Sequence, residues 1–189
     1  MKNALILGLQ YGGILVGVTT VAYALGAEIY FGIAFSFLGF LLSKYLIFHF
    51  GKTYRDRYHG GFLSFGDLYL PLAVLIFTGY ILGIVFQALL MEVLDPDLKR
   101  VAMEMGMERT VDIYKMMGMS DQAIDKAMED AEKTTAMMST FQYVVSLFGA
   151  IFLSAFWAAI YSLILKRERP YDPMTYQSGD QSQTIDHGE

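Results

Sequence analysis

The charge-free stretch from Thr134 to Leu165 constrains the fold more than any other part of this chain. It contains no Asp, Glu, Lys, Arg or Pro and a single glycine, Gly149. An amphipathic segment that begins at Ser120 leads into it. As one helix, Ser120–Leu165 would be about 69 Å long, roughly twice the thickness of a hydrocarbon core. We therefore expect one helix whose first half stands outside a bilayer and whose second half crosses it.

Further apolar stretches precede this one, and charged segments separate them. Charged residues make up 17% of the chain, against about a quarter of a soluble domain. Long charge-free runs between charged segments are typical of multi-pass membrane proteins. We predict an all-α membrane protein in which residues 1–169 form a four-span membrane domain, with spans at about 4–27, 29–48, 68–91 and 140–165.

The first span has an alternative interpretation as a cleaved signal peptide. Lys2 precedes it, and the small residues Ala24 and Gly26 follow it. Its apolar part is longer than that of a usual signal peptide, and a second apolar stretch follows at once. We therefore favour a retained transmembrane helix.

Lys44 is the one charged residue inside the second predicted span. It lies about one turn from the predicted end of that span at Phe48. A lysine there can extend its stem and place its ammonium among the lipid headgroups, and we expect it to do so. The alternative is an intramembrane cation that serves an ion or a substrate.

Residues 92–139 are predicted to form a helical hairpin outside the membrane. Asp95 and Pro96 are typical of a helix N-cap followed by the first helical residue. This first helix should run to about Met117, Gly118 should end it, and Ser120 should cap the second. The polar residues 170–189 bury too little apolar surface to fold alone, so we predict a disordered tail.

Basic residues predict the orientation in the membrane. They flank the first and fourth spans and lie between the second and third, at Lys2, Lys52, Arg55, Arg57 and Lys166. The positive-inside rule therefore places both termini in the cytoplasm. The hairpin would then be periplasmic, and the protein would be a multi-pass protein of a bacterial inner membrane.

The segment from His49 to Asp67 is predicted to be a cytoplasmic loop in which basic and aromatic residues alternate. It could bind anionic headgroups or a phosphate ligand, with glycine N–H groups assisting. We favour the simpler explanation of positive-inside charge with interfacial aromatic residues, since no phosphate motif is present. The candidate interaction residues are Tyr54, Arg55, Asp56, Arg57, Gly60, Gly61 and Phe65.

Small residues recur at four-residue spacing in the spans, which places them on single helix faces. In lipid, helices associate by close backbone approach over such faces. We expect packing within one bundle; the alternative is that one face, in the first span, docks a second copy or another membrane protein. The candidate packing residues are Gly8, Gly12, Gly13, Gly17, Gly79, Gly83, Ser146, Ala150, Ser154, Ala158 and Ser162.

Several features together resemble one membrane protein family. They are the four spans, the charged helical insert after the third, and the sequence motifs Tyr54-Arg55-Asp56, Gly60-Gly61 and Ser64-Phe65-Gly66. In this respect the chain resembles the family known as domain of unknown function 4199, found mainly in Bacteroidota. The resemblance implies a four-helix inner-membrane protein. It implies no activity, cofactor or catalytic residue.

Methionine is concentrated in the predicted hairpin. Ten of the twelve Met residues lie between Met91 and Met138. Packing of the two arms explains part of this cluster, and a Cu(I) site is an alternative because thioethers are soft ligands. We predict that the exposed remainder, with Met103, Met105 and Met116, is a partner surface.

The sequence gives little support for catalysis or cofactor binding. There is no Cys, the three histidines have no metal-ligand spacing, and no basic block suggests nucleic acid. We therefore predict a non-enzymatic scaffold or accessory subunit in contact with lipid, as a homo-oligomer or with another membrane protein. The alternative is a small oligomeric transporter or channel. Transport predicts polar residues that converge at mid-bilayer, whereas a scaffold predicts a sealed core whose polar groups are satisfied.

Overall fold

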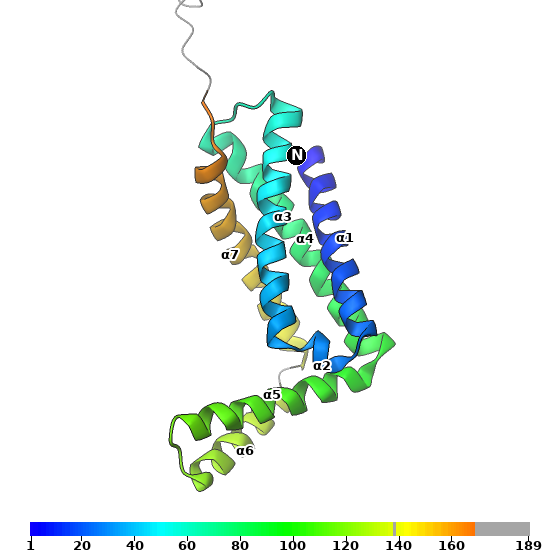
Figure 1. Ribbon diagram of the computed structural model, residues 1–189, viewed down its shortest axis with the longest axis vertical. Coiled ribbons are helices and arrows are strands. Elements are labelled where there is room, and N and C mark those ends of the chain that lie inside the picture. Colours follow the sequence, from blue (N-terminus) through cyan, green and yellow to red (C-terminus); the bar gives the residue numbers. More distant parts are fainter. Residues whose placement is uncertain (138, 169–189) are drawn as a thin grey trace, which may run out of the picture.

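The chain folds into a bundle of long helices with a helical arm at one end (Figure 1). The computed structural model describes residues 1–137 and 139–168, so the predicted disordered tail lies outside the described residues. The helices are α1 (Lys2–Ala24), α2 (Ala27–Tyr30), α3 (Ile33–His59), α4 (Phe65–Leu89), the π-helix η1 (Leu90–Leu94), α5 (Pro96–Met116), α6 (Asp121–Met137) and α7 (Ser139–Leu165).

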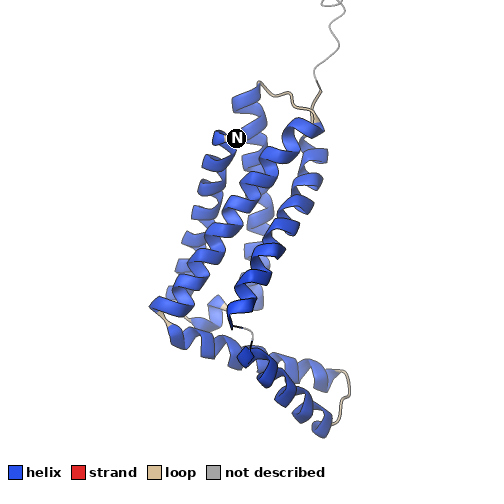
Figure 2. Cartoon of the chain, turned by 180° about the vertical axis from the view of Figure 1, so that it is seen from behind, coloured by secondary structure: helices blue, strands red, loops and turns tan. Residues whose placement is uncertain are grey.

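Four segments are long and apolar enough to cross a membrane. They are Lys2–Ala24, Ile33–His59, Phe65–Leu94 and Val144–Leu165. Figure 2 shows no strand in the part of the chain that the structure describes. The predicted all-α fold with four candidate spans is therefore confirmed.

The four long helices pack in a ring. Helices α1 and α7 each pack against both α3 and α4, so that α3 and α4 lie on opposite corners. The most deeply buried large side chains of the ring include Tyr11 of α1, Ile47 of α3, and Leu68, Leu72 and Ile76 of α4. Lipid is as apolar as these side chains, so close packing rather than water exclusion must hold the ring together.

Local signals set the ends of the helices. The Ser64 hydroxyl accepts a hydrogen bond from the backbone N–H of Asp67 (3.3 Å) and thereby caps α4. The Asp95 carboxylate accepts one from the N–H of Leu98 (3.2 Å) at the start of α5. The backbone of Gly118, with φ +75°, separates α5 from α6.

The prediction of one helix from Ser120 to Leu165 is wrong. Helix α6 ends at Met137 and α7 begins at Ser139. In both views α6 lies beside α5 and runs across the end of the bundle, away from the axis of α7. The two halves have different partners, since α6 packs on α5 whereas α7 packs on α4 and α3. No single straight helix can follow both.

The prediction of a loop from His49 to Asp67 is also wrong, because α3 continues to His59. Its added turns still have a buried face that includes Phe50, Gly51 and Tyr54. A Cβ at Gly51 would lie 2.7 Å from a methyl group of Leu165, so α3 and α7 approach closely there. The contact with α7 favours helix, and the connection to α4 shrinks to residues 60–64.

Candidate functional site

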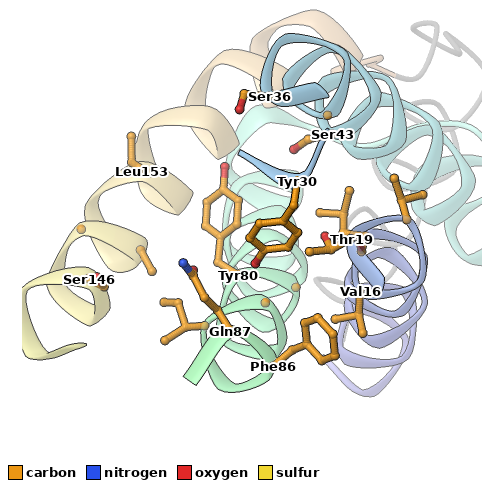
Figure 3. Close-up of a pocket in the computed structure, with 18 of the residues that line it drawn as sticks. Val16, Thr19, Tyr30, Ser36, Ser43, Tyr80, Phe86, Gln87, Ser146 and Leu153 are labelled. Atoms are coloured by element: carbon orange, nitrogen blue, oxygen red, sulfur yellow. Dashed lines mark hydrogen bonds between the residues drawn. The ribbon is translucent and has the colours of Figure 1, made fainter. Parts of the chain in front are cut away.

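A partly open cavity of about 770 Å³ lies inside the bundle, in the half nearer the helical arm. Every spanning helix contributes to its wall, and so does Tyr30 at the end of α2 (Figure 3). Its lining residues are Leu15, Val16, Val18, Thr19, Tyr30, Phe31, Phe35, Ser36, Gly39, Ser43, Gly79, Tyr80, Gly83, Ile84, Phe86, Gln87, Val145, Ser146, Gly149, Ala150 and Leu153. These described lining residues are mostly apolar, and none of them is charged.

Glycines create much of the space. Gly39, Gly83 and Gly149 come from three different helices, and a Cβ added at any of them would meet no heavy atom within 4 Å. The missing side chains therefore leave the wall hollow at three places. Sequence reasoning picked only Gly83 from this set and interpreted it as a packing residue.

Some polar side chains in the wall are satisfied by their own helices. The Thr19 hydroxyl donates to the carbonyl of Leu15 (2.8 Å), and the Ser36 hydroxyl donates to the carbonyl of Gly32 (3.0 Å). A hydroxyl that donates to the preceding turn has no proton left for a ligand and can only accept a hydrogen bond. These two residues therefore offer an incoming molecule an acceptor but no donor.

Three other polar side chains reach into the cavity (Figure 3). Tyr80 and Gln87 extend from α4, and neither forms a hydrogen bond with any residue in 1–130 or 144–168. Tyr30 extends from α2, and burial raises the pKa of its hydroxyl, which therefore stays protonated at neutral pH. The cavity thus offers two hydroxyl groups and an amide to an incoming molecule.

A packed layer closes the cavity on the side away from the arm. Tyr11 is fully buried there, and its hydroxyl shares a 2.8 Å hydrogen bond with the hydroxyl of Ser43. The ring of Tyr11 covers Gly79, and a Cβ at Gly12 would lie 2.9 Å from the Cα of Gly79. The cavity is therefore a pocket with a floor in this conformation.

The small residues proposed for helix packing divide into two groups. In α7, Ala150, Ser154, Ala158 and Ser162 are buried along one face, while Ser146 lines the cavity. In α1, Gly8 and Gly12 touch α4, whereas Gly13 and Gly17 face open space. Spacing alone could not separate these two glycine pairs, because both have the same four-residue period.

At the end of the bundle opposite the arm lie Lys2, Lys52 and Lys166; we call it the basic end. The candidate residues of the supposed loop have different environments there. Tyr54 is buried, Arg57 is exposed, and Asp56 and Arg57 border a groove of about 700 Å³. Gly60 and Gly61 form the turn after α3, and Phe65 stacks on Tyr69.

Arg55 has a role that sequence reasoning missed. Its guanidinium donates to the carbonyl oxygen of Leu165 (2.9 Å) and to the carboxylate of Asp56 (2.7 Å). The first bond satisfies one of the free carbonyls at the end of α7. Two backbone hydrogen bonds between Leu63 and Arg167, each 2.9 Å, tie the chain after α7 to the α3–α4 connection. Arg55 is thus part of a clasp between distant segments.

The arm is also tied to the bundle by contacts that the sequence did not reveal. Arg109 of α5 donates to the carbonyl of Phe31 (2.7 Å), and the Tyr23 hydroxyl donates to the carboxylate of Asp95 (2.9 Å). Of the proposed partner surface, Met103 and Met105 are partly buried, and Met116 is 80% exposed. Among the described residues of the arm, the most exposed methionine surface therefore lies at its tip.

Comparison with known proteins identifies the family. The model of the family described as "Protein of unknown function (DUF4199)" matches residues 6–167, which confirms the resemblance seen in the sequence. Neither the curated proteins nor the solved structures include a match to this chain.

Proposed function

This chain belongs to DUF4199, a family of proteins of unknown function, so we propose a function from the geometry of the structure. We propose that it is a non-enzymatic membrane protein that binds a lipid-like amphiphile in the cavity between its spans. The proposal rests on a cavity whose wall is mostly apolar and into which Tyr80 and Gln87 extend. Neither side chain has a hydrogen-bond partner in residues 1–130 or 144–168.

The size and chemistry of the cavity support this proposal. Small-molecule sites typically have volumes of about 300–1,000 Å³ and apolar walls with a few polar groups that fix orientation. An acyl chain would meet the apolar wall, and a hydroxyl, ester or amide group would meet Tyr30, Tyr80 or Gln87. The surrounding bilayer supplies such molecules at high concentration.

We place binding before catalysis because none of the described residues that line the cavity is an Asp, Glu, His, Lys or Arg. General acid–base catalysis usually depends on such groups. The polar groups that the described lining residues supply are hydroxyls and one amide, which suit recognition better than proton transfer.

The experiment compares three glycine-to-leucine variants with the same change in chemistry. Gly83→Leu and Gly149→Leu add side chains to the cavity wall, and neither Cβ meets a heavy atom within 4 Å. Gly13→Leu is the matched control. A Cβ at Gly13 also meets no heavy atom within 4 Å, and Gly13 does not line this cavity. Each protein is reconstituted in vesicles that contain a phosphatidylcholine with a diazirine in its acyl chain, and the photo-crosslinked peptides are identified by mass spectrometry.

We expect the wild type and Gly13→Leu to be labelled in the cavity-lining parts of α4 and α7. Labelling there should fall about tenfold in Gly83→Leu and Gly149→Leu, as a loss of about 1.4 kcal/mol of binding free energy would give. Equal labelling of all four proteins at these positions would show that lipid does not occupy the cavity, and would refute the proposal.

Transport is a second candidate, and it is favoured by the depth of Tyr80 within α4. It requires the floor formed by Tyr11 and Ser43 to open, so that the pocket can alternate between the two sides. Transport of a fluorescent lipid across vesicles by the wild type, and its absence in Gly83→Leu, would support this candidate over simple binding.

The role of scaffold or accessory subunit rests on the arm. The tip exposes Met116 and Met117, and methionine is common on adaptable binding surfaces. Replacing Met103, Met105 and Met116 with Gln should leave the fold intact and remove a co-purifying partner. Persistence of the same partners would contradict this role.

The proposed location is a bacterial inner membrane with both termini in the cytoplasm. The clustering of Lys2, Lys52 and Lys166 at the basic end supports this orientation. A reporter that is active only in the cytoplasm should work when fused after Arg169 and fail when inserted near Gly118. The reverse result would overturn the orientation.

A further inference from the structure

Lys44 lies deep within the apolar part of α3, which corrects the prediction of a lysine near the end of its helix. It is eight residues from Lys52, about 12 Å along the helix, and twelve from Gly32, about 18 Å. Helix α1 gives a second estimate of the depth of Lys44. The adjacent Ser43 shares a hydrogen bond with Tyr11, and Tyr11 lies nine residues, or about 13 Å, from Lys2. Both estimates place Lys44 near the middle of a hydrocarbon core of about 30 Å.

The ammonium of Lys44 lies over an aromatic ring and does not extend toward the basic end. Its Nζ is 3.6 Å from the ring centroid of Trp157 on α7 and 4.9 Å from that of Phe40. The hydroxyl of Tyr161 donates to the backbone carbonyl of Lys44 (3.0 Å), which fixes α3 against α7 at this level. Cation–π attraction offsets part of the cost of a charge in hydrocarbon, but an ionisable side chain at that depth usually also pairs with another ionisable group or with backbone carbonyls.

The spans themselves supply no anionic side chain that could pair with Lys44. The sequence has no Asp or Glu in residues 3–27, 29–55, 68–91 or 134–165. Among the side chains of residues 1–130 and 144–168, none forms an ion pair with Lys44. The cation is therefore matched only by aromatic rings within the described part of the molecule.

The surface around Lys44 is accessible from the side of the bundle. It lies at the seam between α3 and α7, where Phe40, Tyr45 and Phe156 are 51%, 62% and 50% exposed. These side chains would face lipid in a bilayer. A single positive charge thus lies within an aromatic surface that a neighbouring helix can reach.

We propose that this seam docks a transmembrane helix of another protein, and that an Asp or Glu near the middle of that helix pairs with Lys44. Complementary charge selects this occupant, since attraction between opposite charges is strongest where water is absent. A second copy of this chain would bring another Lys44 and no carboxylate at the same depth. A lipid phosphate would lie near the level of Lys52, about 12 Å away. The inference concerns a lipid-facing seam and does not depend on the cavity being a binding site.

The test uses synthetic transmembrane peptides as the partner. Three Leu-rich peptides without tryptophan differ only at a central position, which is Asp, Asn or Leu, and each carries an energy-transfer acceptor. The full-length protein is reconstituted in phosphatidylcholine vesicles, where Trp157 is its single tryptophan and lies against Lys44. Energy transfer from Trp157 measures docking, and its emission spectrum reports the nearby charge.

We expect the Asp peptide to bind about tenfold or more tightly than the Leu and Asn peptides. Lys44→Gln should reduce its binding to the level of the Leu peptide, whereas Lys44→Arg should retain it. Lys52→Gln removes a lysine from the same helix at the boundary and should leave binding unchanged.

Two results would overturn the proposal. One is equal binding of the Asp and Leu peptides to the wild type, a comparison that needs no variant and so does not depend on whether Lys44→Gln folds. The other is a Trp157 emission that responds to phosphatidylglycerol in the vesicles as strongly as to the Asp peptide, which would identify an anionic lipid as the occupant.

Discussion

Two glycines of α1, five residues apart, allow the packing of the bundle to be tested with one chemical change. A Cβ at Gly8 would lie 2.7 Å from the carbonyl oxygen of Leu75 and 2.8 Å from the Cβ of Thr78, both on α4. A Cβ at Gly13 would meet no heavy atom within 4 Å. The backbone oxygen of Leu75 cannot rotate away, so Gly8→Ala must push α1 and α4 apart.

The expected magnitudes follow from two effects. Ala in place of Gly inside a helix stabilises by about 0.8–1 kcal/mol, and this gain is common to both variants. Overpacking costs about 1–3 kcal/mol and arises only at Gly8. Gly13→Ala should therefore be up to about 1 kcal/mol more stable than wild type. Gly8→Ala should lie about 1–3 kcal/mol below Gly13→Ala, because the helix-propensity gain cancels in the comparison.

The assay is unfolding of the purified protein in mixed micelles by increasing amounts of sodium dodecyl sulfate, followed by far-ultraviolet circular dichroism. The difference in unfolding free energy between the two variants isolates the cost of separating α1 from α4. Equal stability of Gly8→Ala and Gly13→Ala would show that the close approach at Gly8 does not hold the bundle together.

Three further predictions concern contacts of α7, of the clasp and of the arm. Ala158 is fully buried, so Ala158→Leu should lower the thermal midpoint in detergent by more than Leu153→Ala, whose side chain is 46% exposed; equal effects would remove the special status of the small-residue face. Arg55→Gln should lower the free energy of unfolding by about 1.5–3 kcal/mol, because it removes the charged hydrogen bond to the end of α7. Amide exchange in the last turn of α7 should become faster, and the exposed Arg57→Gln serves as the control. Asp95→Ala removes both the cap of α5 and the hydrogen bond from the Tyr23 hydroxyl. It should therefore lower the free energy of unfolding by about 0.5–2 kcal/mol and increase proteolysis of the arm. Unchanged proteolysis would argue against this anchoring.

The sequence by itself determined the helical class and the four candidate spans. Each span is a continuous property of some twenty neighbouring residues, and the cost of placing a charge in hydrocarbon can be judged without knowing which helix lies beside it. The same holds for Asp95 and Pro96, since a cap and the helix that it starts are adjacent in the chain.

Only the tertiary structure decided how these helices are used. It divided the predicted helix from Ser120 to Leu165, because α6 and α7 have different partners. It showed that Gly8 contacts α4 whereas Gly13 does not, and it placed Lys44 against Trp157. It also showed that Arg55 donates a hydrogen bond to the carbonyl of Leu165, 110 residues away in the chain. The physical reason is that close approach, cation–π contact and capping by a distant side chain depend on which residues meet across elements, whereas hydrophobicity and local caps are properties of consecutive residues.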